Sequence, residues 1–128
     1  MSGLQTALQP TPRKLTTHQK AVLIQVLLVF PDQQVNVCYS PKALDAFAYA
    51  QDFVTIFKAI GWTVKEAESP EIATDRSTGL AVIVSRVPDL PPSAQALRDS
   101  LRIYGIEVEV FCDSEQNIAP SSFLLAVG

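Results

Sequence analysis

Two glycine residues, Gly61 and Gly105, each stand between a helix-like pattern and a strand-like pattern. In the segment before each glycine, apolar residues recur every three or four positions, which is the spacing of one helix face. In the segment after it, apolar and polar residues alternate, as they do in a strand with one face in water. A glycine readily adopts the left-handed conformation that ends a helix. Because a strand is also expected before each helix, the sequence predicts two β-α-β units in one chain.

The starts of the first two helices are indicated by capping residues. Thr16 and Gln19 fit a capping box, so we expect the first helix to begin at Thr17 and to run to about Phe30. Ser40-Pro41 places a capping hydroxyl before a proline at the first helical position, which predicts a second helix from Pro41 to Ile60. The five expected strands are Val35–Tyr39, Trp62–Ala67, Leu80–Val84, Ile106–Val110 and Phe123–Val127.

The apolar character of each strand predicts its place in the sheet. Strands three and five are apolar on both faces, which is typical of central strands, whereas strands two and four alternate and fit edges. Both β-α-β units should be right-handed, and the segment from Phe111 to Ser121 is long enough for an antiparallel return. We therefore predict a three-layer α/β/α fold with a five-stranded mixed sheet, order 2-1-3-5-4, with strand five antiparallel. A ferredoxin-like α+β sheet, in which strands two and three form a hairpin, is the alternative.

Length and charge limit the domain count and the partners. A chain of 128 residues fits one domain. Residues 1–15 are polar and contain prolines, so we expect a flexible leader there and a single α/β domain over residues 16–128. The net charge is −3 and the lysines and arginines form no cluster. Because nucleic-acid binding depends on neutralising phosphates, we expect no nucleic-acid partner.

The longest apolar run extends from Ala21 to Phe30 and is interrupted only by Gln25. It is too short for a membrane span, which needs about twenty residues. It also begins too late for a signal peptide and has no small-residue cleavage site after it. We therefore expect a soluble, cytoplasmic chain without a membrane span. A helix that is apolar nearly all round should be buried, either across the sheet or against a second copy.

Residue patterns that carry chemistry are scarce. No glycine-rich phosphate loop occurs, so no cofactor is expected. His18 is the only histidine and is interpreted as a surface residue, which leaves no expected metal ligand or catalytic residue. Cys38 and Cys112 are too few and too far apart for a disulfide framework, and are interpreted as small buried residues on strands.

One crevice remains as a candidate binding site. In open α/β sheets, ligands bind beyond the carboxyl ends of the strands, where the direction of the connections reverses. In the predicted order this point lies between strands one and three. Lys42 and Arg86 would lie there near a helix N-terminus, where they could hold a small anion. The candidate ligand-binding residues are Tyr39, Ser40, Lys42, Ser85 and Arg86.

A longer pattern carries a resemblance to a known group of domains. It consists of Tyr49-Ala50-x-x-Phe53-x-x-x-Phe57-x-x-x-Gly61-Trp62-x-Val64, preceded by Thr17-x-Gln19-Lys20. With these residues the chain resembles a family of bacterial α/β domains without an assigned function, which often follow membrane helices. The resemblance covers Thr16 to Val127 and rests on helix-stripe, capping and strand residues. The chain departs from the family by lacking a membrane helix, and the resemblance implies no catalytic residue.

These observations favour a non-enzymatic module that binds a partner protein or a second copy of itself. The support comes from the missing catalytic patterns, the low content of charged residues (18%) and the apolar first helix. The alternative is a regulatory domain that binds a small anion or a nucleotide in the crevice between strands one and three.

Overall fold

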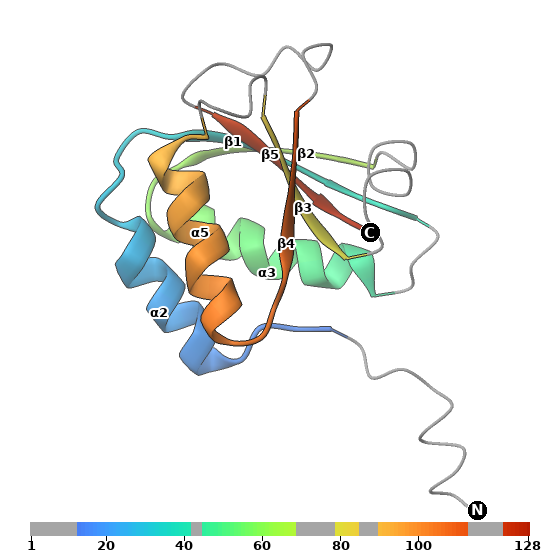
Figure 1. Ribbon diagram of the computed structural model, residues 1–128, viewed down its shortest axis with the longest axis horizontal. Helices are drawn as coiled ribbons and strands as arrows, with labels where there is room; N and C mark the ends of the chain where they lie inside the picture. Colours follow the sequence, from blue (N-terminus) through green and yellow to red (C-terminus); the bar gives the residue numbers. More distant parts are fainter. Residues whose placement is uncertain (1–12, 42–44, 69–78, 85–89, 113–121) are drawn as a thin grey trace, which may run out of the picture.

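The computed structural model describes residues 13–41, 45–68, 79–84, 90–112 and 122–128. Within these ranges three helices and five strands form a mixed α/β structure, as the sequence predicts (Figure 1). The elements in chain order are α2 (Thr17–Leu27), β1 (Gln34–Tyr39), α3 (Ala46–Ala59), β2 (Thr63–Glu68), β3 (Leu80–Val84), α5 (Pro92–Ile103), β4 (Val108–Cys112) and β5 (Phe123–Val127).

The strand order of the sheet is β2-β1-β5-β3-β4, so the predicted order 2-1-3-5-4 is wrong. Strand β5 lies between β1 and β3, instead of between β3 and β4. It pairs with β1 in parallel and with β3 antiparallel. The ferredoxin-like alternative is also wrong, because β2 and β3 are not neighbours. The two predicted β-α-β units are nevertheless present, since β1 pairs with β2 in parallel and β3 with β4.

The wrong prediction of the strand order in the sheet has a physical explanation. Apolar character on both faces identified β3 and β5 as central strands, and the structure confirms this, because every residue of both strands is buried. The same pattern does not say which central strand lies beside β1. With β5 in the middle, the β3-α5-β4 unit runs in the opposite direction to the β1-α3-β2 unit.

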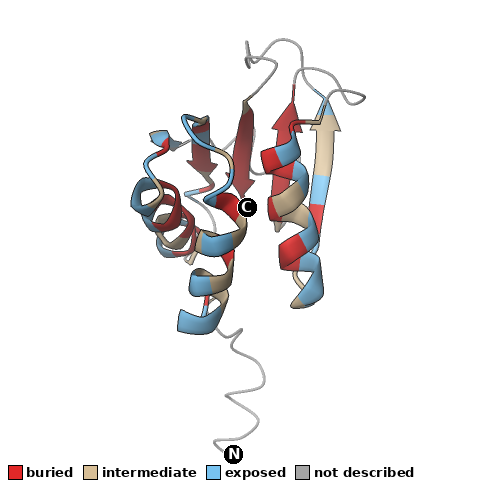
Figure 2. Ribbon diagram, turned by 90° about the vertical axis from the view of Figure 1, so that its left-hand side faces the viewer, coloured by how far each residue is buried: buried red, intermediate tan, exposed pale blue. Residues whose placement is uncertain are grey.

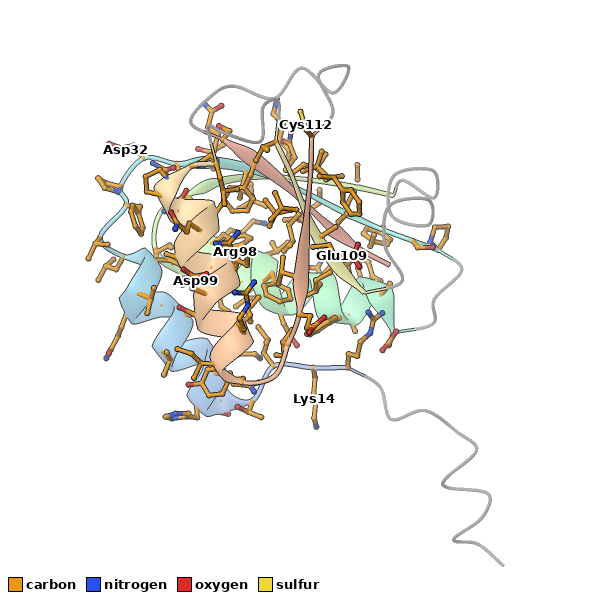
Figure 3. The ribbon with its side chains drawn as sticks, viewed as in Figure 1. Lys14, Asp32, Arg98, Asp99, Glu109 and Cys112 are labelled. Carbon is orange, nitrogen blue, oxygen red and sulfur yellow. The ribbon has the colours of Figure 1, made fainter. Side chains whose placement is uncertain are left out.

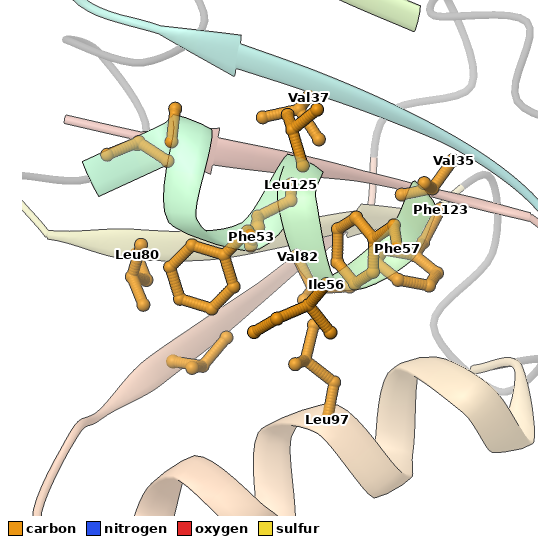
Figure 4. Packing of buried hydrophobic residues seen from close by; sticks show 14 of the residues in the cluster. Val35, Val37, Phe53, Ile56, Phe57, Leu80, Val82, Leu97, Phe123 and Leu125 are labelled. Atoms are coloured by element: carbon orange, nitrogen blue, oxygen red, sulfur yellow. The ribbon is translucent and has the colours of Figure 1, made fainter. Parts of the chain in front are cut away.

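Two apolar clusters lie on the two faces of the sheet. The larger cluster contains buried residues of all three helices, together with alternate strand residues such as Val82 and Leu125 (Figure 4). The smaller cluster contains Cys38, Ala81, Ile83, Leu124 and Ala126, and no helix of the described ranges contributes to it. The described residues therefore give no support to the expected three-layer arrangement, which needs helices on both faces.

Three predicted helix ends are confirmed, whereas α2 ends at Leu27 and not at about Phe30. The predicted capping box is confirmed, because the Gln19 backbone N–H donates to Thr16 Oγ1 and the Thr16 N–H donates to Gln19 Oε1. Gly61 and Gly105 have φ angles of +86° and +75°, as expected for helix-ending glycines. The predicted start of the second helix at Pro41 is wrong, because α3 begins at Ala46 and has Asp45 at its N-cap.

Candidate interaction surface

Of the five residues predicted to line an anion crevice, the structure describes Tyr39 and Ser40, which lie at the end of β1. Tyr39 ends β1, and the backbone N–H of Ser40 donates to the Val127 carbonyl at 2.9 Å. Strand β3 runs the other way, since Leu80 pairs with Val127, and its last residue Val84 lies at the opposite end of the sheet. The predicted crevice required strands one and three to be adjacent and parallel. In the structure β5 lies between β1 and β3, and these two strands run in opposite directions. Lys42, Ser85 and Arg86 themselves lie outside the described residues.

Tyr39 and Ser40 are parts of the packed structure at the end of β1. The Tyr39 ring contacts the ring of Phe47 edge-on, with centroids 5.1 Å apart. Ser40 is buried. The small-anion site therefore stays a prediction, and the described part of the chain adds no observation in its favour.

Within the residues that the structure describes, no group of three or more His, Cys, Asp or Glu side chains is placed to hold a metal ion. Cys38 is buried in the smaller cluster, and this burial raises the pKa of its thiol to about 11. A thiol with a raised pKa carries little thiolate, which is the nucleophilic form. Cys112 lies exposed at the end of β4, so its predicted burial is wrong.

Helix α2 packs against both α3 and α5 and contributes Leu23 and Leu27 to the larger cluster (Figure 2). These two side chains are fully buried. The Lys20 ammonium lies 3.4 Å from the Asp52 carboxylate of α3, which ties one side of α2 to that helix. On the other flank, the His18 ring meets the Tyr104 ring, just after α5, edge-on at 6.1 Å.

The outward side of α2 is in contact with water and carries both apolar and polar residues, since Thr17 and His18 are exposed in its first turn. Leu28 and Val29, just after the helix, are 60% and 71% exposed. Ala21 and Gln25 are exposed and Val22 is half-buried. We call these five residues the α2 face. The expectation that α2 is buried across the sheet is wrong, because Leu23 and Leu27 are its only buried residues.

The α2 face carries no charge. The one charged residue between Thr17 and Val29 is Lys20, and it lies on the side toward α3, paired with Asp52. The sequence gives one local sign of this face, because Gln25 is the single polar residue in the run from Ala21 to Phe30 and is exposed. The inward packing of Leu23 and Leu27 establishes which side of α2 points outward.

No protein-family model, curated protein or solved structure matches the chain. In the part of the chain that the structure describes, no helix has both the length and the hydropathy that a membrane-spanning helix needs. The site is therefore interpreted from its own geometry.

Proposed function

We propose that this chain is a protein-interaction module that associates with a second copy of itself through the α2 face. The observation that carries the proposal is the side-by-side exposure of Leu28 and Val29 next to the exposed Ala21 and the half-buried Val22 of α2. Single exposed apolar residues are common on protein surfaces, but contiguous apolar patches mark interaction sites.

The absence of charge on the α2 face favours a second copy over a charged partner. In a twofold symmetric contact each patch meets an identical patch, so any net charge would repel itself. Gln25 is the one polar side chain exposed within the helical part of this face, and an amide can both donate and accept a hydrogen bond across such a contact.

The size of the face favours a weak dimer. Burying a Leu or Val side chain contributes about 1.5–3 kcal/mol, and association costs on the order of 4–15 kcal/mol in lost freedom of motion. The free energy gained by burying Leu28, Val29 and their apolar neighbours in both copies is only modestly larger than this cost of association. We therefore expect a dissociation constant on the order of micromolar or weaker.

The test is the molar mass measured by light scattering over a wide range of protein concentrations. The unmodified chain should move from the mass of one copy toward that of two as concentration rises. Val29→Glu should weaken this association by at least about tenfold, because the contact would bury an unpaired carboxylate.

Phe47→Glu is the matched control. Phe47 is 53% exposed, but it contacts Tyr39 of β1 and so lies on another surface of α3 from Asp52, which faces α2. This variant should associate like the unmodified chain once circular dichroism shows that it is folded. The proposal fails if the unmodified chain keeps the mass of one copy at millimolar concentration. It also fails if Phe47→Glu abolishes association while Val29→Glu does not.

A further inference from the structure

The segment Arg13–Thr16, just before α2, is attached to α3 by side-chain contacts. The Arg13 guanidinium forms a two-pronged pair with Asp45, in which Nε donates to Oδ2 and Nη2 to Oδ1, both at 2.9 Å. The Arg13 backbone N–H also donates to Asp45 Oδ2, at 2.8 Å. Paired planar contacts of this kind are among the stronger and more directional polar interactions in proteins.

Arg13 joins three parts of the fold. Its Nη2 also donates to the backbone carbonyl of Gly128, after β5, and its guanidinium carbon lies 5.1 Å from the centre of the Tyr49 ring. Two residues later, Leu15 is 3% exposed, and its backbone N–H donates to Asp52 Oδ2 at 2.9 Å. The expected flexible leader thus includes residues with specific contacts.

Asp45 occupies a position where an aspartate side chain ordinarily accepts a hydrogen bond from the first turn of its own helix. It is the N-cap residue of α3, yet its side chain makes no capping hydrogen bond. An N-cap carboxylate that bonds to the helix contributes about 1 kcal/mol. Here both carboxylate oxygens are turned to Arg13 instead. A residue that departs from its local preference and contacts a distant segment points to a role for that contact.

We infer that Arg13–Thr16 is a detachable strap, held closed by the Arg13–Asp45 pair, which opens without unfolding of the rest of the domain. Opening breaks the contacts of Arg13 and removes Leu15 from α3. It also frees the N-terminal end of α2, because Thr16 is the N-cap of that helix. The pair is partly exposed, with 30% of the Arg13 side chain and 23% of the Asp45 side chain accessible, so water can compete for it.

Cleavage by trypsin within Arg13–Thr16 measures how often the strap is open. Trypsin cleaves after Lys14, whose side chain points away from the domain (Figure 3). A protease needs several residues in extended form around the bond, so cleavage there requires the strap to open. When opening and closing are fast, the rate of cleavage follows the population of the open form. Lys58, within α3, reports opening of the domain as a whole.

The experiment measures tryptic cleavage of the full chain after Lys14 and after Lys58 by mass spectrometry. Asp45→Asn should raise the rate at Lys14 by about five- to tenfold, the effect of weakening a partly exposed charged hydrogen bond. In the unmodified chain, cleavage after Lys14 should already be faster than cleavage after Lys58, because opening of the strap leaves α3 folded. Asp99→Asn is the control, because Asp99 pairs only with its neighbour Arg98 among the described ion pairs (Figure 3). It should leave both rates unchanged.

Two results would overturn the inference. One is an unchanged rate at Lys14 in Asp45→Asn, which would mean that the pair does not hold the strap. The other is cleavage of the unmodified chain after Lys14 that is no faster than cleavage after Lys58, which would mean that the strap opens only when α3 unfolds. Neither result depends on whether the chain associates through the α2 face.

Discussion

The indole Nε1 of Trp62 donates a hydrogen bond of 2.7 Å to the backbone carbonyl oxygen of Phe30. This bond joins the residue before β2 to the turn that follows α2. The Trp62 ring also stacks on Phe57 of α3 at 5.1 Å and meets Phe123 of β5 edge-on. One side chain thus fixes the exit of α2 relative to a helix and a central strand.

Replacing Trp62 with Phe should destabilise the domain by about 2–3 kcal/mol. The change removes the bond to the Phe30 carbonyl, which contributes about 1 kcal/mol, and leaves part of a buried ring volume empty. Urea unfolding at neutral pH measures the effect. Thr63→Ala, at the exposed next residue, is the control and should change the free energy of unfolding by less than about 0.5 kcal/mol. A Trp62→Phe effect as small as the control would show that the Phe30 bond is unimportant.

The two helix-ending glycines should respond alike to substitution. A Cβ added at Gly61 or Gly105 meets no atom within 4 Å, so the only cost is that of a left-handed backbone for an L residue. Gly61→Ala and Gly105→Ala should each lose about 1 kcal/mol, and Gly→Asn at either position should lose less. Thermal unfolding of the four variants measures this. A loss above about 3 kcal/mol at either glycine would contradict the account, because it would require a steric clash.

The Arg13–Asp45 pair should make stability depend on pH in the acid range. The hydrogen bonds that Arg13 donates to the Asp45 carboxylate lower the pKa of Asp45 to about 2. An aspartate in the unfolded chain has a pKa near 3.9. A lowered pKa in the folded state means that the stabilisation is complete above about pH 4 and is lost as the pH falls toward 2.

The unmodified chain should therefore exceed Asp45→Asn in stability by on the order of 1 kcal/mol at pH 7, the range for partly exposed pairs. The difference should shrink between pH 4 and pH 2. Urea unfolding of both proteins at several pH values measures it. A difference that stays constant down to pH 2 would show that Asp45 ionisation is not linked to folding.

The two cysteines should differ in reactivity. Cys112 is exposed, whereas Cys38 is buried with a pKa of about 11. At pH 8 a disulfide reagent should therefore modify one thiol of the folded chain quickly and the second only after denaturant is added. Cys112→Ser should remove the fast reaction and Cys38→Ser should keep it. Fast modification of both thiols in the folded chain would contradict the burial of Cys38.

Local sequence signals predicted the elements well. The Thr16–Gln19 capping box, the two left-handed glycines and the central places of β3 and β5 each depend on residues near one another in the chain. The start of α3 was misplaced because Ser40-Pro41 resembles a helix start, although α3 begins at Ala46.

The order of the sheet and the orientation of α2 depend on contacts between distant residues, and no local pattern encodes them. The residues of β5 are buried on both faces, and this pattern does not distinguish β1 from β4 as its second neighbour. The candidate crevice depended on that choice, so the wrong neighbour for β1 removed its basis. The packing of Leu23 and Leu27 into the core determines which side of α2 points outward.

The most direct test of self-association is an intermolecular NMR measurement on a mixture of isotope-labelled and unlabelled chains. At a concentration where light scattering shows two copies, we expect contacts between chains from the methyl groups of Val22, Leu28 and Val29. Phe47, on another surface of α3, should show none. Contacts between chains that arise elsewhere and leave these three methyl-bearing residues untouched would contradict the account.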